Sequence, residues 1–458
     1  MKIIRTTTIV FLILFGVTSF AQDSLRLEKI IIVSRHGLRA PLEKNFATLD
    51  SLVDTCNSYK DKWKLWEKKG VKGSELTPKG VELENYFGKF FRLWFDSIGF
   101  QLHADELYFG ASSKQRTVAT ANSFASGLMP HMTIPVHFRH TNEGGYGFYD
   151  VNYLPLLYDE GFKEGVVFDT NQFHTEAYRE IELLKEEPSY EFLEDVLGYS
   201  KSPRAQTKGC QHFITDSVQL YFYERKNGKI VKRLEPTMYG DLKVANMASD
   251  ALILMYYEFP DALRSFFKRD FSFDDMCKLA SVKDQYGRKL FTAPIVAVNV
   301  SHCMLKNIYA EMNCNWHKFT FLCTHDSMIQ SLLTALRVED YELKNTIEKD
   351  TPIGVKLVLE KWVDPNVDDS VKIDSSECVR YKRYIKARLY YQSTEQVQEM
   401  QVLNLKNPPQ FCELSFTGLE KEENGMYDYD AFMKHIEKTL DAYKLTAIGK
   451  NPFDNNQR

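Results

Sequence analysis

The sequence contains no apolar run long enough to cross a membrane. Its most apolar stretch, Ile9 to Phe15, falls short of the roughly 20 residues that a spanning helix needs. Lys2 and Arg5 precede this stretch, and small residues lead up to Ala21, which is the pattern of a secretory signal peptide. We therefore expect residues 1–21 to be removed and the mature chain to be periplasmic or secreted, without a membrane partner.

An excess of basic residues is also missing. Of the 58 Lys and Arg, Lys2 and Arg5 fall within the expected signal peptide, which leaves 56 against 62 Asp and Glu, a net charge of −6. Nucleic acids and anionic membranes attract proteins through a basic face, so we expect neither as a partner. A small anionic ligand would have to be held by a local basic pocket.

Common cofactor and metal motifs are absent. There is no Gly-x-Gly-x-x-Gly or Walker-type loop, so nucleotide binding by those routes is not expected. Two groups of cysteine and histidine residues lack the tight spacing of common zinc sites, so we expect neither a metal nor another cofactor. These groups are Cys303, Cys314, His317 and Cys323, and His131, His137 and His140.

All eight cysteines follow Ala21 and would meet an oxidising compartment after export. Four disulfides would then be allowed, although eight cysteines permit 105 pairings. The pair favoured by closeness in sequence is Cys303 with Cys314.

Two β-branched, apolar runs end in ionisable residues. Residues 28–34 read as a strand buried on both faces and lead into Arg35 and His36. Residues 318–324 have the same character and lead into His325 and Asp326. Ligands of open α/β sheets bind at the carboxyl ends of strands, so the two clusters can meet if their strands are neighbours.

The remaining pattern predicts an α/β fold with a mixed, mostly parallel central sheet flanked by helices. Residues 22–140 and 291–458 are expected to form the core, and residues 141–290 an inserted, mostly helical subdomain. Further predicted elements are helices that begin at Thr77 and Lys114, a helical stretch at Tyr178–Leu197, strands at 106–110, 354–362, 380–391 and 397–403, and helices at 329–336 and 429–443.

Arg35, His36 and Arg39 match what phosphoryl transfer from a monoester requires. Neutral imidazole is a good nucleophile at mildly acidic pH, and guanidinium forks hold phosphate oxygens. Gly37 would let the backbone and a phosphate approach closely. The alternative is a turn with solvated arginines, which the place after a buried strand disfavours.

His325 and Asp326 fit the other half of such a site. Asp326 can protonate the departing oxygen, and His325 can donate a hydrogen bond to the phosphate. In the competing interpretation Asp326 is an N-cap of the following helix, a position that Asp favours. The presence of the first cluster favours the chemical role.

Together these motifs resemble those of the histidine acid phosphatases, which start with Arg-His-Gly-x-Arg-x-Pro and carry a late His-Asp. The likeness spans most of the chain and is weakest from about 141 to 290. Residues 331–336 and 351–354 are more similar to the periplasmic glucose-1-phosphatase type than to the bacterial phytase type.

The resemblance implies a role for each matching residue. His36 would accept the phosphoryl group and Asp326 would be the proton donor. It also implies an α/β core with a helical subdomain, activity in acidic solution and no metal. The phosphate-binding residues that it implies are Arg35, Arg39, Arg116 and His325.

We therefore expect an exported acid phosphatase that hydrolyses a small phosphomonoester, such as glucose 1-phosphate, through a phosphohistidine. One alternative is a phytase, which needs further cations, and Lys44 and Arg139 are candidates for these. The alternative from another class is a phosphate-ester binding protein without turnover, which the presence of both His36 and Asp326 disfavours. The oligomeric state is left open.

Overall fold

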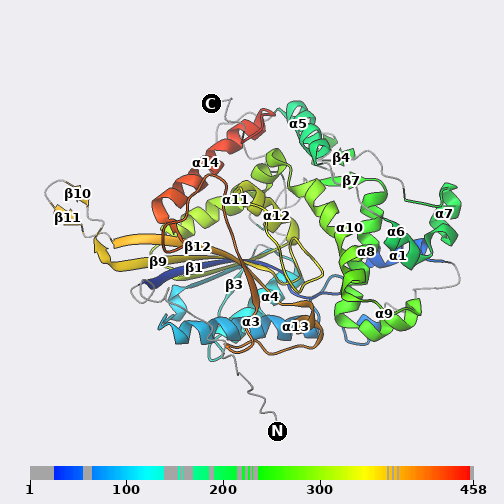
Figure 1. Ribbon diagram of the computed structural model, residues 1–458, viewed down its shortest axis with the longest axis horizontal. Helices are drawn as coiled ribbons and strands as arrows, with labels where there is room; N and C mark the ends of the chain where they lie inside the picture. The colour runs from blue at the N-terminus through cyan, green and yellow to red at the C-terminus, as the bar shows by residue number, and fades with distance from the viewer. Residues whose placement is uncertain are drawn as a thin grey trace, which may run out of the picture.

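A central mixed β-sheet organises the fold in the computed structural model (Figure 1). The structure describes residues 25–54, 64–138, 153–154, 157, 169–184, 190–213, 219–221, 225–226, 229–230, 236–368, 371–373, 376–378 and 381–453.

Helices and strands follow one another mostly in runs of one kind along the described chain. The helices are α1 (Glu43–Leu52), α2 (Lys64–Glu67), α3 (Pro78–Ser97), α4 (Gln115–Leu128), α5 (Thr170–Leu183), α6 (Glu191–Leu197), α7 (Pro203–Lys208), α8 (Asp241–Glu258), α9 (Pro260–Phe267), α10 (Phe273–Phe291), α11 (Pro294–Asn313), α12 (Asp326–Ala335), α13 (Thr394–Gln398) and α14 (Tyr429–Ala447). The strands are β1 (Arg26–Arg35), β2 (Leu107–Ala111), β3 (Val136–His137), β4 (Gln219–Tyr221), β5 (Arg225–Lys226), β6 (Lys229–Ile230), β7 (Thr237–Tyr239), β8 (Phe319–Thr324), β9 (Lys356–Asp368), β10 (Val371–Ile373), β11 (Ser376–Cys378), β12 (Tyr381–Tyr391), β13 (Gln410–Glu413) and β14 (Tyr427–Asp428).

The strand order of the central sheet is β13-β12-β9-β1-β8-β2-β3, with β14 also paired to β12. From β1 through β8 and β2 to β3 the neighbours are parallel. From β1 through β9 and β12 to β13 they are antiparallel. The prediction of a mixed sheet flanked by helices is therefore confirmed. Its mostly parallel character is wrong, because three strand pairs are parallel and four, including β12 with β14, are antiparallel.

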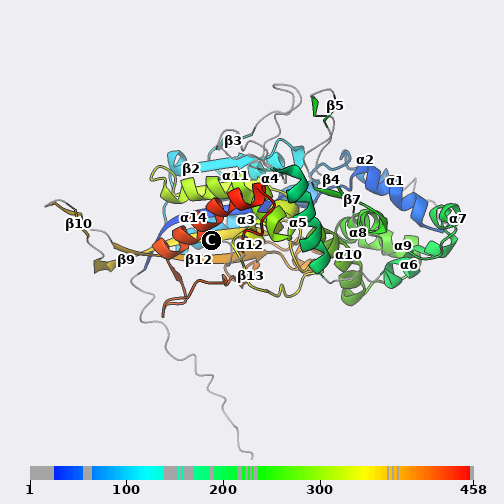
Figure 2. The same ribbon diagram turned by 90° about the horizontal axis from the view of Figure 1, so that it is seen from above.

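Strand β1 lies in the middle of the sheet and contributes to two separate cores. Ile31 and Val33 belong to one cluster of buried apolar residues, and Ile30 and Ile32 to the other. Helices α11, α12 and α14 cover the first face, and α3 and α4 cover the second (Figures 1 and 2). Alternate side chains of a strand point to opposite faces, so a strand covered on both sides needs an unbroken apolar run.

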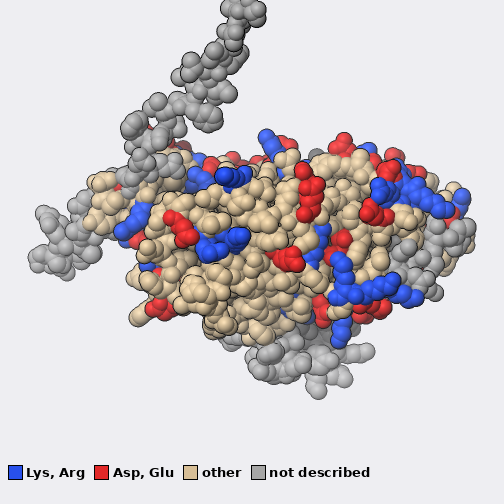
Figure 3. Space-filling view, turned by 90° about the horizontal axis from the view of Figure 1, so that it is seen from below, with Lys and Arg blue, Asp and Glu red and all other residues tan. Residues whose placement is uncertain are grey.

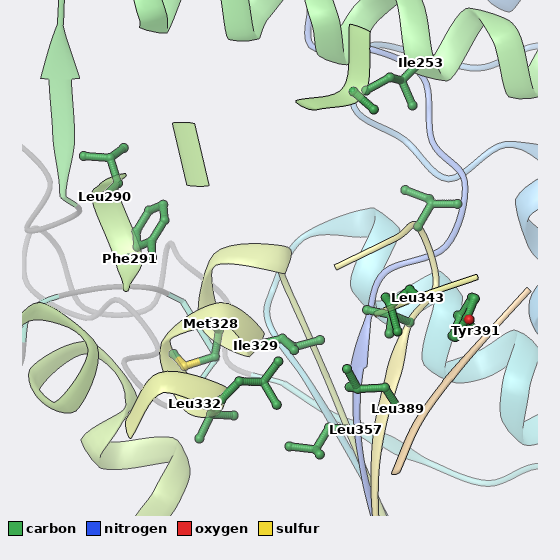
Figure 4. Packing of buried hydrophobic residues seen from close by; sticks show 14 of the residues in the cluster. Ile253, Leu290, Phe291, Met328, Ile329, Leu332, Leu343, Leu357, Leu389 and Tyr391 are labelled. Atoms are coloured by element: carbon green, nitrogen blue, oxygen red, sulfur yellow. The ribbon is translucent and has the colours of Figure 1, made fainter. Parts of the chain in front are cut away.

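The first face is packed by α12 against the antiparallel half of the sheet. Figure 4 shows Ile329 and Leu332 of α12 near Leu357 of β9, with Leu389 of β12 alongside. All four side chains are fully buried. This contact anchors α12, which begins at Asp326, onto the sheet.

A group of helices lies beyond the carboxyl end of β1, on the right in Figure 1. It includes α6 to α10 and also α1, which packs against α8 although the sequence analysis assigns these two helices to different units. The predicted division at residues 140/141 and 290/291 stays a prediction. Among the residues that the structure describes, no helix is both long and apolar enough to span a membrane.

Two predicted elements differ from the structure. The strand predicted at 397–403 is wrong, because Ser393 caps a short helix, α13, by a reciprocal pair of hydrogen bonds with Gln396. The helical stretch predicted at Tyr178–Leu197 is two helices, since α5 ends at Leu183 and α6 begins at Glu191. Pro188 lies between them, and proline interrupts helical hydrogen bonding.

The expected disulfide between Cys303 and Cys314 is wrong. Cys303 lies within α11 and Cys314 directly follows it, so about 16 Å of helix separates them, far beyond disulfide reach. Six cysteines of the described chain carry thiols, which excludes four disulfides. The expected signal peptide, residues 1–21, and Cys56 lie outside the described residues.

Helices α3 and α4 meet at two glycines, which gives a test of the packing. A Cβ atom at Gly88 would lie 2.0 Å from the carbonyl oxygen of Phe124, so Gly88→Ala should lower the free energy of unfolding by about 1–3 kcal/mol. Urea unfolding measures this loss. The matched control is Gly287→Ala on α10, where the added Cβ meets only the end of the Gln330 side chain. An equal loss in both variants would contradict the close helix contact.

Candidate functional site

The pairing of β1 with β8 brings the two ionisable clusters together. The strands are parallel with Arg35 opposite Thr324, and the His36 N–H donates to the Thr324 carbonyl at 3.1 Å. His36 and His325 therefore leave the sheet side by side. Their rings lie edge to face with centroids 5.5 Å apart, and both side chains are buried.

His36 is held as a neutral imidazole with one nitrogen available. Its Nδ1 lies 3.0 Å from the carbonyl oxygen of Gly37, which can only accept, so Nδ1 carries the proton and Nε2 has the lone pair. Burial, followed by the charges of Arg116 and Arg39, lowers the pKa of His36 well below its usual value. The ring thus stays neutral in mildly acidic solution, and the lone pair of Nε2 remains available for nucleophilic attack.

Both ring nitrogens of His325 are engaged. The Arg116 guanidinium, which only donates, lies 3.3 Å from Nδ1, so Nδ1 accepts and Nε2–H donates to Ser112 Oγ at 3.2 Å. Burial and then Arg116 lower the pKa of His325 well below its usual value. His325 therefore positions Arg116 beside His36.

Three arginines surround the histidines with their Nε–H groups unused. Arg35, Arg39 and Arg116 each have a buried Nε atom without a hydrogen-bond partner. Buried donors are almost always paired, so these three unused donors beside the histidines can hydrogen-bond an acceptor supplied by a ligand. Burial, and then Arg39, lowers the pKa of Arg116 to about 9, because these cations are crowded together. The arrangement is suited to an anion.

Two carboxylates hold the outer ends of these arginines, and the sequence analysis missed both. Asp250 of α8 accepts from Arg39 Nη2 at 3.1 and 3.2 Å and from the Asn45 amide at 2.9 Å. Glu348 accepts from Arg35 Nη1 at 2.9 Å. Asp250 is one acid in the apolar stretch 245–257. An acid in such a stretch is expected to be buried beside a cation, so the sequence contained a signal for this residue. Nothing in the sequence around Glu348 indicates its partner.

Asp326 faces the histidines from the start of α12. It is the first residue of the helix and not its N-cap, which is His325, so the capping interpretation is wrong. Its Oδ2 lies 3.2 Å from Arg35 Nη2 and 3.6 Å from Lys283 Nζ, and its side chain remains 32% exposed. Burial would raise its pKa, but Arg35 and Lys283 hold the pKa of Asp326 well below its usual value.

Gly37 is required by packing beside the site. A Cβ there would lie 2.8 Å from Cγ of Glu84, a buried acid paired with Lys356 Nζ at 2.8 Å. The Gly37 N–H donates to Thr120 Oγ1 at 2.9 Å. The structure shows that this glycine makes room for Glu84, and its expected part in letting a phosphate approach stays a prediction.

The structure brings all six expected site residues together, while their individual roles stay predictions. Lys44 lies exposed on α1, and Arg139 is outside the described residues. Figure 3 shows acidic and basic side chains interspersed on one face of the molecule. The positive charge available to an anionic ligand therefore comes from a local group of side chains and not from the surface as a whole. Its members are Arg35, Arg39 and Arg116.

Comparisons with known proteins agree with this geometry. The family model described as histidine phosphatase superfamily (branch 2) matches residues 26–387. A glucose-1-phosphatase of Salmonella typhimurium is 32% identical over 90% of this chain and 92% of its own length. A glucose-1-phosphatase of Providencia rettgeri is 31% identical over 92% of this chain and 93% of its own.

Solved structures share the fold. The apo form of the Hafnia alvei phytase has a TM-score of 0.73 at 21% identity, covering 92% of this chain and 98% of that one. The same phytase in complex with myo-inositol hexakis sulphate has a TM-score of 0.72 at 22% identity, covering 91% and 97%.

The unused arginine donors predict tight binding of a tetrahedral oxyanion. Arg116→Met should weaken phosphate binding about 10- to 100-fold, because one charge-assisted hydrogen-bonding group is lost. Isothermal titration with inorganic phosphate measures the change. Arg388→Met, which alters an arginine paired with Glu360 on the antiparallel half of the sheet, is the control and should bind normally. Unchanged binding in both variants would argue against an anion site at Arg116.

A buried acid behind the site predicts how stability depends on pH. Burial, and then Asp350, raises the pKa of Asp284 to about 8, above its value of roughly 3.9 in the unfolded chain. Between these values the folded state binds more protons, so this group makes stability fall as pH rises. Asp284→Asn should therefore stabilise the protein more near pH 8 than near pH 5, by a difference of at least about 1 kcal/mol.

Thermal unfolding of both proteins at the two pH values tests this. Asp261→Asn on the surface of α9, where Asp261 is 89% exposed, is the control and should show no pH-dependent gain. A gain from Asp284→Asn that is equal at both pH values would mean that packing, and not ionisation, is responsible.

Proposed function

The chain belongs to the histidine phosphatase superfamily, branch 2, and is a phosphoric monoester hydrolase; on this basis we propose that it cleaves a sugar phosphate through a phosphorylated His36. The observation that carries the proposal is the arrangement at the end of β1 and β8. A neutral, buried His36 lies among three arginines with unused donors, opposite Asp326.

In the first step His36 Nε2 attacks phosphorus in line with the leaving oxygen. The P–N bond forms as the P–O bond breaks, and Asp326 gives its proton to the departing alkoxide. Arg35, Arg39 and Arg116 hold the equatorial oxygens, whose charge their guanidinium groups neutralise. In the second step water attacks phosphorus: its P–O bond forms as the P–N bond to His36 Nε2 breaks, Asp326 takes up the proton of the water, and inorganic phosphate leaves.

Asp326 can act as a proton donor only when the substrate is bound. In the free protein Arg35 and Lys283 keep the pKa of Asp326 low, so the carboxyl group is ionised. A bound phosphate places negative charge between the same cations and raises this pKa. A monoanionic ester, which predominates in acidic solution, also brings the proton that the carboxylate requires. Acidic working conditions follow from this requirement.

For the substrate we favour glucose 1-phosphate over inositol hexakisphosphate. The glucose-1-phosphatases match 90% or more of this chain, whereas the phytase AppA of Escherichia coli matches 26% at 34% identity. An inositol hexakisphosphate needs cations beyond the phosphate-holding set. Lys44 is exposed, and Lys283 is engaged by Asp326 and Glu348.

We place this activity outside the cytoplasm, periplasmic or secreted, because residues 1–21 have the pattern of a signal peptide. Amino-terminal sequencing of protein recovered from the producing cells tests this. A mature chain that still begins at Met1 would contradict export by cleavage.

Loss of the proton donor should depend on the leaving group. Asp326→Asn should lower kcat on glucose 1-phosphate about 10²- to 10⁴-fold, and much less on p-nitrophenyl phosphate, whose anion leaves without protonation. His36→Ala should lose turnover and the acid-labile, alkali-stable phosphoryl label of a quenched reaction. Equal losses on both substrates would remove the acid role of Asp326, and full activity of His36→Ala would remove the nucleophile.

The preferred substrate is tested by kcat/KM. We expect a higher value for glucose 1-phosphate than for inositol hexakisphosphate, measured without added metal at acidic pH. The opposite order would favour the phytase alternative. Tight phosphate binding with no turnover of either ester, or of p-nitrophenyl phosphate, would instead identify a binding protein.

A further inference from the structure

A group of metal-ligating side chains lies at the opposite end of β8 from His325. Glu311 is near the end of α11, and Cys314 and His317 follow in the turn that leads into β8. Their ligand atoms all lie within 4.8 Å of one another. His317 Nδ1 is 3.0 Å from Glu311 Oε2 and 3.9 Å from Cys314 Sγ. The sequence analysis had grouped Cys314 and His317 with two other cysteines and had overlooked Glu311.

Each of the three side chains is oriented by a neighbour. The His317 ring stacks on Tyr108 with centroids 5.3 Å apart. Thr320 Oγ1 donates to Glu311 Oε2 at 2.8 Å, and the Trp316 N–H donates to Cys314 Sγ at 3.4 Å. Such outer contacts fix the ligands of metal sites and tune their affinity.

We propose that Glu311, Cys314 and His317 bind one Zn²⁺ ion, with a fourth position open to solvent. Carboxylate, thiolate and imidazole are ligands that zinc accepts, and zinc bonds of about 2.0–2.3 Å place neighbouring ligand atoms about 3.3–3.6 Å apart. The 3.0 and 3.9 Å separations lie on either side of this range. The third separation, between the ligand atoms of Glu311 and Cys314, is at most 4.8 Å, so side-chain rotations are needed to enclose the ion.

The charges of the cluster suit a divalent cation. Binding releases the thiol proton, and the resulting thiolate and the Glu311 carboxylate together neutralise the ion. The neighbouring cation, Lys29, directs its ammonium group to the backbone carbonyls of Glu311 and Cys314. Lys29 thereby holds the end of α11 and leaves the three ligand atoms to the metal.

Zinc at this place would join the end of α11 to the start of β8. The ion would bind the folded state and not the unfolded one, so it should raise the unfolding temperature in proportion to its concentration and affinity. It lies apart from His36 and Asp326, so the proposal does not depend on the phosphatase mechanism. Hydrolysis of p-nitrophenyl phosphate is expected to be the same with and without it.

Metal titration of the mature protein, stripped with a chelator, tests the site. We expect one equivalent of Zn²⁺ by isothermal titration near pH 7.5 in a phosphate-free buffer, since phosphate precipitates zinc. Co²⁺ at the same site should give a thiolate-to-metal charge-transfer band and the intense visible bands of tetrahedral coordination.

Variants assign the ligands. Cys314→Ser should abolish the charge-transfer band, His317→Gln should abolish tight binding, and Thr320→Val should weaken binding about tenfold. Cys210→Ser is the matched control, because Cys210 also lies near a histidine and a glutamate, yet the described residues form no second group of this compactness.

The unfolding temperature of each metal-free variant shows whether it still folds. If a variant unfolds early without metal, the Co²⁺ spectrum of the folded wild type still decides the matter. A wild type that binds no Zn²⁺, a Co²⁺ spectrum without a thiolate band, or binding that survives both Cys314→Ser and His317→Gln would overturn the proposal.

Discussion

Parallel hydrogen bonding between β1 and β8 governs the arrangement of the whole molecule. The register that sets Arg35 opposite Thr324 makes His36 and His325 neighbours, although they come from distant parts of the chain. That register depends on burial of both strands between two layers of helices, because a slip of one residue would exchange the side chains of the two cores. The apolar packing of the sheet is thus what aligns the polar site.

A second constraint is that some guanidinium nitrogens of the arginines bind protein carboxylates, while others are left for a ligand. Asp250 and Glu348 take the terminal nitrogens of Arg39 and Arg35, which fixes the planes of the guanidinium groups. The Nε–H groups stay buried without partners. Protein carboxylates therefore compensate part of the positive charge and leave the remainder for an anion. Burial, and then the charges of Arg116 and Arg39, lower the pKa of His36 and favour its neutral form in acidic solution.

Much of the fold could be predicted because its signals are local. The apolar run before Arg35 and the one before His325 identify β1 and β8, and Thr77 followed by proline identifies the start of α3, where Thr77 Oγ1 accepts from the Gly80 N–H. The strand predicted at 397–403 failed because a second local signal, helix capping, was stronger than the strand-like pattern. The Ser393 capping box overrode an apolar, strand-like stretch at 397–403.

The sequence could not show which partners the supporting residues of the site contact, for a different reason. Asp250, Lys283 and Glu348 act through contacts with residues more than forty positions away, and no spacing rule links them. The same holds for Glu84, which explains Gly37 only once the packing is known. Motifs therefore locate reacting groups, whereas the groups that hold them emerge from tertiary structure.

The pairing of Arg39 with Asp250 bears on how this enzyme could be re-engineered or could diverge. Arg39 follows a strand of the sheet, and Asp250 belongs to α8 in the group of helices beside it. A chimera that exchanges the helices to obtain a new specificity would also exchange the counter-ion of Arg39. The exchanged helices must therefore include an acid at the position of Asp250. Otherwise the buried charge of Arg39 has no counter-ion. The two parts of the chain are thus not interchangeable modules.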